Sequence, residues 1–209
     1  MTKFAVMLLA AASLTAVSSA QATVTVSTTP LQVVGTGALV VDFDNAVAPG
    51  YSFVGTGTVD SVSVGGMTAQ PAGDQTSWYT VHSGESATFT SATALNNIQV
   101  YVGSIDGYNT FEVLGQGGNV IQTFTGNDLS PTHDGNWTDG NTNRLVSFDL
   151  TGAAAPVYGM KFSSSGNSLE FDNISVSGAP EPAAWALMMV AVGGMGSALR
   201  TRRRKAVAA

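Results

Sequence analysis

Short runs of β-branched and aromatic residues, separated by turn residues, fill the chain between positions 23 and 178. Runs of this kind, bounded by Gly, Asn, Asp and Ser, are typical of β-strands. No stretch in this span has the apolar spacing of a long amphipathic helix. The pattern predicts strands at Thr23–Ser27, Gln32–Val34, Ala38–Phe43, Tyr51–Val54, Ser61–Val64, Ser77–Val81, Ser86–Thr90, Asn97–Val102, Thr110–Leu114, Val120–Thr125, Arg144–Asp149, Val157–Ser163 and Ser168–Ser177.

Alternation of apolar and polar residues is clearest in the last of these runs. The alternation predicts that the side chains of Leu169, Phe171 and Ile174 face the core. The same period of two turns Glu170 and Asp172 outward, with an irregularity at Asn173. So many short strands in this span predict an all-β fold, a two-sheet sandwich of jelly-roll type.

A glycine-rich stretch joins two of the predicted strands. Gly115-Gln116-Gly117-Gly118 has no following helix and no Lys-Ser or Lys-Thr pair, so it does not fit a phosphate-binding loop. We interpret it as a hairpin turn.

Charge excludes several classes of function. Residues 23–178 hold thirteen acidic and two basic residues, a net charge of −11. A segment this acidic repels phosphates, which argues against nucleic-acid binding. The chain has no cysteine, so disulfides, thiolate metal sites and cysteine nucleophiles are excluded. The acids form either a solvated coat or, in part, a Ca²⁺ site.

The first 22 residues have the layout of a secretory signal peptide. A single Lys3 precedes an apolar stretch, and small residues follow, ending in Ala20-Gln21-Ala22. Cleavage by signal peptidase is expected after Ala22, following export through the Sec machinery.

The other end of the chain predicts a membrane segment. Residues 183–199 carry no charge and would span about 25 Å as a helix, enough to cross a thin bilayer. Trp185 falls near the outer interface. A basic cluster follows, which the positive-inside rule keeps in the cytoplasm as a stop-transfer signal. Its members are Arg200, Arg202, Arg203, Arg204 and Lys205.

Pro180-Glu181-Pro182, the Trp185-Ala186 pair, the apolar run and the basic cluster occur in order over residues 179–209. This arrangement resembles the PEP-CTERM sorting signal in its PEPxxWA form. The resemblance implies a Gram-negative bacterium, processing by a membrane exosortase near residues 180–182, and release or attachment at the cell surface alongside exopolysaccharide. The two prolines keep the segment extended, where a processing enzyme can reach it.

The middle of the chain, residues 23–178, is similar to ectodomains that carry this signal, in the stretches GSIDGYNTFEVL and SLEFDNISV. Jelly-roll ectodomains of this kind resemble carbohydrate-binding modules, an analogy of fold rather than of function.

Catalytic chemistry finds little support. His82 and His133 lie in no recognisable motif, and there is no G-x-S-x-G elbow. Two histidines without a third ligand do not favour zinc. No spacing identifies a carboxylate pair for glycoside hydrolysis. We therefore predict no catalytic residues.

Two acidic groupings are candidates for Ca²⁺, which prefers six to eight oxygen ligands. Asp42 and Asp44 would share one outward face with Glu170 and Asp172 if their strands pair. The second grouping is the loop HDGNWTDGNTN. It departs from an EF-hand at Asp139, where Gly is required, and at Leu145, where Glu is required, so an EF-hand is rejected. A looser Ca²⁺ site in this loop stays open, and ordinary Asx turns are the alternative.

Sugar binding needs exposed aromatic side chains beside polar groups. Trp137 lies in that polar loop and is the best candidate, and Tyr108 is a further one. Trp78, Tyr79 and Tyr101 are instead predicted to be core or sheet-face residues.

Together these features predict an exported cell-surface or extracellular-matrix protein, processed by an exosortase and associated with exopolysaccharide, with a non-catalytic ectodomain. It would pass through the inner membrane as an intermediate. The alternatives are a Ca²⁺-dependent carbohydrate-binding module and, less favoured, an enzyme acting on polysaccharide.

Overall fold

The structure, a computed structural model, describes residues 22–178. The predicted signal peptide apart from Ala22, the Pro180-Glu181-Pro182 motif, Trp185, the segment 183–199 and the basic cluster lie outside the described residues. Ala22 is exposed and precedes the first strand. Between residues 22 and 178, no helix has the length and apolar character needed to span a membrane.

Strands account for most of the described chain, as predicted. One short α-helix and one short 3₁₀ turn are the helical elements of residues 22–178. The elements are β1 (Thr25–Pro30), β2 (Ala38–Val41), β3 (Tyr51–Gly55), β4 (Thr58–Asp60), β5 (Trp78–Val81), β6 (Ser86–Gly103), β7 (Asn109–Gly115), η1 (Gln116–Gly118), β8 (Val120–Thr125), α1 (Gly126–Leu129), β9 (Arg144–Asp149), β10 (Val157–Ser164) and β11 (Leu169–Gly178).

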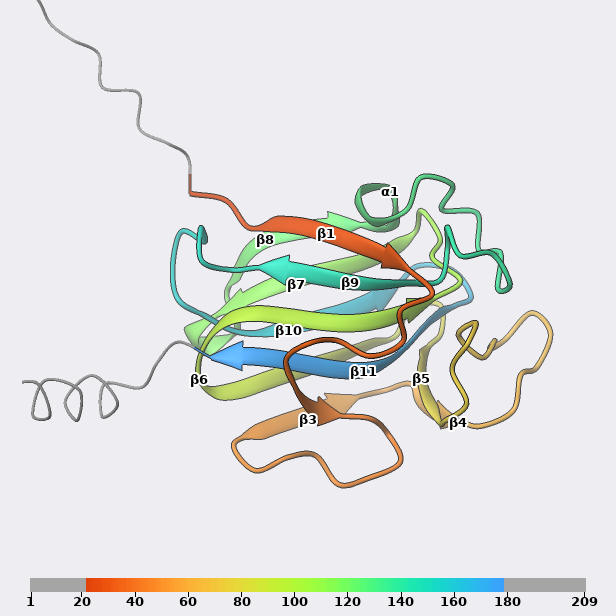
Figure 1. Cartoon of the computed structure of the whole chain (residues 1–209), viewed down its shortest axis with the longest axis horizontal. Coiled ribbons are helices and arrows are strands. Elements are labelled where there is room, and N and C mark those ends of the chain that lie inside the picture. Colours follow the sequence, from red (N-terminus) through yellow and green to blue (C-terminus); the bar gives the residue numbers. More distant parts are fainter. Residues whose placement is uncertain (1–21, 179–209) are drawn as a thin grey trace, which may run out of the picture.

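The strands form two layers, and every pairing is antiparallel (Figure 1). Sheet I has the order β1-β9-β6-β11, after which β2 and β5 pair with successive parts of β11, and β4 pairs with β5. Sheet II has the order β3-β6-β10-β7-β8.

Strand β6 belongs to both sheets. Its first part, Ser86 to Ser91, pairs with β3 and β10, and its last part, Asn97 to Gly103, pairs with β9 and β11. The sequence predicts two separate strands here, and that expectation is wrong. A single strand that passes from one sheet to the other forms a corner of the sandwich and fixes the two layers relative to each other.

Aromatic rings from the two sheets meet in the core. Phe162 of β10 stacks on Phe171 of β11 with ring centroids 4.3 Å apart. The ring centroids of Phe124 in β8 and Phe148 in β9 lie 5.3 Å apart. These contacts between layers establish a β-sandwich, and the burial of each such ring stabilises the fold by about 2–3 kcal/mol.

Most predicted strands are confirmed, several of them to within a residue. The predicted strands Gln32–Val34 and Ser61–Val64 are wrong, because both segments are loops. The glycine-rich turn is confirmed: η1 connects the antiparallel pair β7 and β8. The expected irregularity at Asn173 is also confirmed, since its φ is 55° and the register of β11 shifts there.

A long loop between β4 and β5, residues 61–77, covers the outer face of sheet I, and we call it the roof segment. Trp78 Nε1 donates a hydrogen bond of 2.9 Å to Thr68 Oγ1 in this segment. The Tyr101 hydroxyl donates to the Ala72 carbonyl oxygen. The roof segment thus closes over sheet-face residues that would otherwise meet water.

The roof segment overturns one expectation about β11. Glu170 and Asp172 do point away from the core, as the alternation predicts, but they are 1% and 0% exposed. The period of two reports which face of the sheet a residue occupies, and it cannot report that a distant loop covers that face.

The two ends of the described chain leave the sandwich at the same end. Figure 1 shows the start of β1 and the tip of β11 on the left, whereas α1 and the loop before β9 lie on the right. Both ends of the described chain therefore lie at the end of the sandwich opposite to the right-hand loops.

Candidate functional site

The loops that Figure 1 shows at its right-hand end line an open pocket of about 300 Å³. It lies between the roof segment, the β6–β7 loop, the loop before β9 and the start of β11. The residues that line it are Ser63, Gly65, Gly66, Met67, Thr68, Ala69, Ser104, Asp106, Gly135, Trp137, Asn167, Ser168 and Glu170. Small and polar side chains therefore dominate its wall, with two large apolar ones at positions 67 and 137.

Glu170 is the buried carboxyl of this pocket. It accepts hydrogen bonds from the hydroxyls of Ser104 and Ser168 and, at 3.1 Å, from the backbone nitrogen of Ala69. Burial raises the pKa of the Glu170 carboxyl, and these donors oppose that rise. With its donors drawn from three segments of the chain, Glu170 fixes the pocket's shape.

Asp106 is the second carboxyl of the pocket. Burial raises the pKa of the Asp106 carboxyl, the Tyr108 hydroxyl lowers it in part, and the neighbouring Asp134 raises it further. Gly135 passes close beside it with φ of 69°. A Cβ at position 135 would lie 2.6 Å from both carboxylate oxygens, so only glycine fits here.

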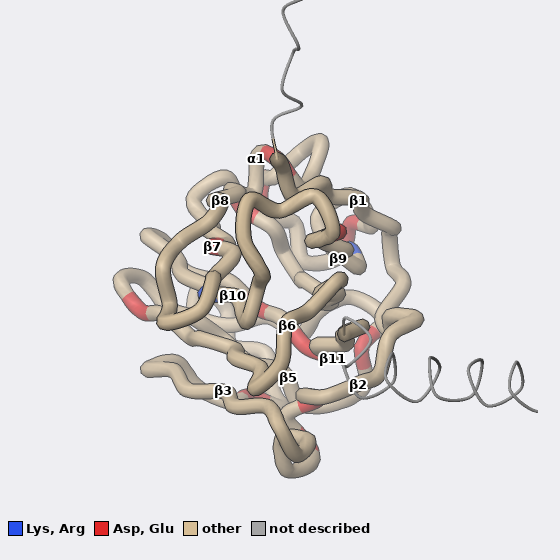
Figure 2. The backbone as a smooth tube through the Cα atoms, turned by 90° about the vertical axis from the view of Figure 1, so that its left-hand side faces the viewer, with Lys and Arg blue, Asp and Glu red and all other residues tan. Residues whose placement is uncertain are grey.

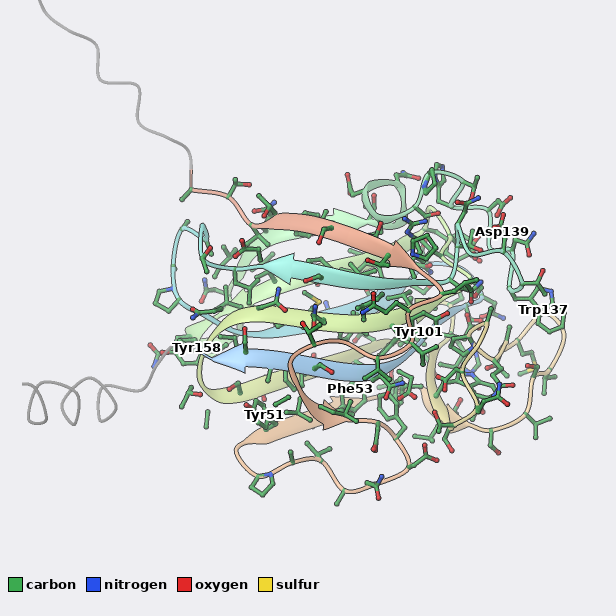
Figure 3. The ribbon with its side chains drawn as sticks, viewed as in Figure 1. Tyr51, Phe53, Tyr101, Trp137, Asp139 and Tyr158 are labelled. Atoms are coloured by element: carbon green, nitrogen blue, oxygen red, sulfur yellow. The ribbon has the colours of Figure 1, made fainter. Side chains whose placement is uncertain are left out.

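Trp137 stands on the rim of the pocket and is 54% exposed, which confirms the expectation that its loop presents it to solvent (Figure 3). Met67 of the roof segment, 53% exposed, also lines the pocket. An exposed indole beside polar groups can stack on a flat apolar surface while its neighbours form hydrogen bonds.

The loop that carries Trp137 is held by side-chain turns. Asp134 Oδ1 accepts from Asn136 N at 3.3 Å, and Asn136 Oδ1 accepts from Thr138 N at 3.0 Å. The Asx turns considered for this loop are thus present. The buried Asn143 anchors the loop by donating to the carbonyl oxygens of Asn136 and Asp139, at 3.1 and 2.9 Å.

Sequence reasoning missed Asn143, Asp106 and the contribution of Glu170 to this pocket. Asn143 Oδ1 also accepts from Ala72 N at 2.8 Å, so one amide joins the roof segment to the loop before β9. A buried amide that bonds two remote segments has no local pattern. The polar composition of GSIDGYN, which contains Asp106, is the one sequence signal that indicates a polar site in this region.

Three other aromatic candidates are buried, as expected. Trp78, Tyr79 and Tyr101 are at most 5% exposed. Burial, with a contribution from Asp74, raises the pKa of Tyr101 to about 12, consistent with a neutral sheet-face phenol. These residues cannot offer a surface to a ligand.

The four acids do not form one solvent-facing cluster, because the roof segment buries Glu170 and Asp172, whereas Asp42 and Asp44 lie in the loop after β2. Asp42 accepts from Asn45 Nδ2 at 2.8 Å in a local turn, and Asp44 accepts from Ser77 Oγ at 2.8 Å. The strand pairing on which that grouping depended does occur, since β2 pairs with β11. Figure 2 shows the acidic positions spread around the domain rather than gathered on one face.

Asp172 instead faces Asp74, a residue that sequence reasoning did not single out. The hydroxyl of Thr76 lies 2.6 Å from Asp74 Oδ1 and 3.0 Å from Asp172 Oδ2. Burial raises the pKa of Asp172 to about 8, and the proximity of Asp74 raises it as well. Over residues 22–178, no group of three or more His, Cys, Asp or Glu side chains is arranged to hold a metal ion.

The histidines occupy loops, as expected. His82 lies in the turn after β5, with Nε2 3.4 Å from Thr58 Oγ1. His133 lies in the loop before β9, with Nδ1 3.2 Å from the carbonyl oxygen of Ser130. Neither histidine lines the pocket.

A second cavity, of about 510 Å³, lies at the other end of the sandwich beside η1. It is lined by Tyr158, by the glycine-rich turn and by small side chains of β6, and no charged residue contributes to it. Figure 3 shows Tyr158 and Trp137 at opposite ends of the domain.

Comparison with known proteins finds no matching family model and no matching curated protein. Among solved structures, the chain is similar to CsCBM6-3 from Clostridium stercorarium, solved with cellobiose, at 19% identity and a TM-score of 0.35, over 61% of this chain and 94% of that one. A family 6 carbohydrate-binding module matches at 15% identity and a TM-score of 0.36, over 62% of this chain and 95% of that one.

The catalytic unit of a GH87 α-1,3-glucanase from Streptomyces thermodiastaticus matches at 16% identity and a TM-score of 0.33, over 64% of this chain and 28% of that one. Every one of these TM-scores is below 0.5, so the geometry of the site, rather than these likenesses, bears on function.

Proposed function

We propose that residues 22–178 form a glycan-binding domain whose site is the pocket beneath Trp137. The observation that carries this proposal is the exposed indole on the rim of a pocket of about 300 Å³ whose lining includes several polar side chains. An indole covers the apolar face of a sugar ring, and hydroxyls, amides and carboxyls bind the ring hydroxyls. Ser63, Asp106 and Asn167 supply such groups.

The charges of the site favour a neutral glycan. Asp106 and Glu170 line the pocket, and Asp134 lies close enough to raise the pKa of Asp106. The two basic side chains of residues 22–178 are engaged elsewhere: Arg144 donates to Thr28 Oγ1, and Lys161 pairs with Glu112. A uronic acid or sulfated sugar would meet like charge here and find no cation.

The binding domain belongs, in this proposal, to an exported bacterial surface or matrix protein with a sandwich of jelly-roll type. Signal peptidase removes residues 1–22, and an exosortase processes the chain near Pro180-Glu181-Pro182. The C-terminal exit of β11 lies at the end opposite to Trp137 (Figures 1 and 3). A chain held at its C-terminal end would thus present the pocket outward, toward exopolysaccharide.

Binding to a panel of polysaccharides tests the site. Affinity electrophoresis of the purified full-length protein in gels containing neutral or acidic polysaccharides should show retardation by at least one neutral polymer. Trp137→Ala should weaken that binding by about tenfold or more, since stacking of an exposed indole supplies at least about 1.4 kcal/mol. Tyr158→Ala is the matched control and should bind as the wild type does.

Two results would overturn the proposal. One is unchanged binding by the Trp137 variant, and the other is loss of binding by the Tyr158 variant alone, which would move the site to the cavity beside η1. Retardation confined to acidic polymers would contradict the charge argument.

A polysaccharide-cleaving enzyme is the second candidate, because two carboxyls with raised pKa values, Asp106 and Glu170, line one pocket. Glycoside hydrolases use such a pair. Glu170 is 1% exposed and its oxygens are engaged by Ser104, Ser168 and Ala69, which favours a structural carboxyl. Release of reducing ends that disappears in Asp106→Asn would favour the enzyme.

Sorting has a separate test. Replacement of Pro180, Glu181 and Pro182 by alanine should leave the protein in the membrane fraction at its unprocessed mass. Normal processing and release of this variant would rule out the exosortase proposal and leave the glycan proposal untouched.

A further inference from the structure

Two buried carboxyls from different parts of the chain meet beneath the roof segment. Asp74 belongs to that segment and Asp172 to β11, and they are 3% and 0% exposed. The Thr76 hydroxyl oxygen lies between them, 2.6 Å from Asp74 Oδ1 and 3.0 Å from Asp172 Oδ2. The pair therefore joins the roof segment to sheet I.

The hydrogen bonds available to this pair leave two of its four oxygens without a partner. Asp74 Oδ1 accepts from the backbone nitrogens of Gln75 and Thr76, at 2.7 and 3.1 Å, as well as from the Thr76 hydroxyl. The Thr76 hydroxyl has one hydrogen, which serves one carboxyl fully at a time. Asp74 Oδ2 and Asp172 Oδ1 are buried and have no partner among the described residues. Arg144 and Lys161, the basic residues of residues 22–178, bind Thr28 and Glu112 instead. A buried carboxylate left in this condition is strongly unfavourable.

A third oxygen without a partner lies on the same face of β11. Ser175 is 0% exposed and its Oγ makes no hydrogen bond within the described domain. Asp172 pairs with Tyr101 and Ser175 with Gln99, and these two positions of β6 are alternate residues on one face. The bulge at Asn173 brings Asp172 and Ser175 to neighbouring places on that face.

We propose that Asp74, Asp172 and Ser175 contribute ligands to a Ca²⁺ site that fastens the roof segment to sheet I. The charge of one divalent cation balances two carboxylates, and a hard cation takes the carboxylate and hydroxyl oxygens that lack partners here. With two carboxylates, the remaining ligands must be carbonyl oxygens and water, which the variable geometry of Ca²⁺ accommodates.

This site differs from the four-acid grouping suggested by the sequence. It shares Asp172 with that grouping, but Asp74 replaces Asp42 and Asp44, whose side chains bind Asn45 and Ser77. It is also separate from the pocket beneath Trp137, whose lining contains none of its three ligands. The Ca²⁺ and glycan proposals can therefore fail independently.

Calorimetric titration of the purified full-length protein with Ca²⁺, together with thermal unfolding in Ca²⁺ and in a chelator, tests the site. We expect one Ca²⁺ per chain and a higher melting temperature when Ca²⁺ is present, by mass action. Asp74→Asn and Asp172→Asn should each weaken Ca²⁺ binding by about tenfold or more, because fewer charged ligands lower the affinity of such sites. Asp44→Asn, which removes a charge beside Ser77, should bind Ca²⁺ as the wild type does.

Ser175→Ala provides a second variant in case the aspartate variants do not fold. Removal of an unpaired buried hydroxyl should leave the melting temperature in chelator unchanged or higher. The rise that Ca²⁺ produces should become smaller, because a ligand is lost.

Three outcomes would overturn the proposal. The first is a wild type whose melting temperature and heat of titration do not respond to Ca²⁺, which would mean that the two carboxyls share a proton. The second is wild-type Ca²⁺ affinity in Asp74→Asn. The third is a Ca²⁺-induced rise in Ser175→Ala as large as that of the wild type.

Discussion

The side-chain oxygen of Asn143 accepts a hydrogen bond of 2.8 Å from the backbone nitrogen of Ala72. Through this bond, a buried amide in the loop before β9 holds the roof segment 71 residues away in the sequence. The amide nitrogen of the same residue donates to the carbonyl oxygen of Asp139 at 2.9 Å, within the loop that carries Trp137. The rim and the covering loop of the pocket are therefore coupled through one side chain.

Asn143→Ala should lower the free energy of unfolding by about 2–3 kcal/mol, because it leaves the Ala72 N–H and two carbonyl groups without their partner. Urea unfolding measures this. Asn141→Ala is the control: its side chain is exposed, and we expect a change within about 0.5 kcal/mol. Asn143→Ala should also weaken glycan binding although the residue does not line the pocket. Equal destabilisation by both variants would contradict the coupling.

Glu170→Ala should destabilise the protein by at least about 2 kcal/mol, because the Ser104 and Ser168 hydroxyls and the Ala69 N–H lose their common acceptor. Glu170→Gln should destabilise the protein less than Glu170→Ala, since the amide oxygen can still accept some of these hydrogen bonds. Chemical unfolding of the two variants side by side provides the measurement. If glutamine costs as much as alanine, the network depends on the carboxyl itself.

Gly135→Ala should distort the pocket. The backbone at this position has φ of 69°, and the added Cβ would lie 2.6 Å from the Asp106 carboxylate oxygens. The expected cost is about 1–3 kcal/mol, with weaker glycan binding. Gly117→Ala is a matched control, with φ of 78° but open space around its Cβ. Gly117→Ala should lower the free energy of unfolding through backbone strain alone and leave glycan binding unchanged.

Phe162→Ala should be the most damaging of these substitutions, costing about 3–5 kcal/mol, because Phe162 is fully buried and stacks on Phe171 between the sheets. Val54→Ala, at a position 68% exposed in β3, should change stability by less than about 0.5 kcal/mol. Comparison of denaturation midpoints checks both. A small effect of Phe162→Ala would mean that the two sheets do not share one core.

The sequence by itself determined most of the strands and the inward face of β11. A period of two is a local property, because successive side chains of a strand point to opposite faces. It placed Leu169, Phe171 and Ile174 in the core and located the bulge at Asn173. Composition around Trp137 likewise predicted its exposure, since a loop of Asn, Asp and Gly turns has no apolar surface on which to bury an indole.

Only the tertiary structure decided what happens on the outer face of sheet I. Glu170 and Asp172 occupy the face that the pattern assigns them, yet the roof segment, about 100 residues earlier in the chain, buries them. Contacts between remote segments bring Asp74 close to Asp172 and join Asn143 to Ala72. Trp137 and Glu170, also far apart in the sequence, line the same pocket. No local periodicity encodes such contacts, because they depend on how the loops pack on the completed sandwich.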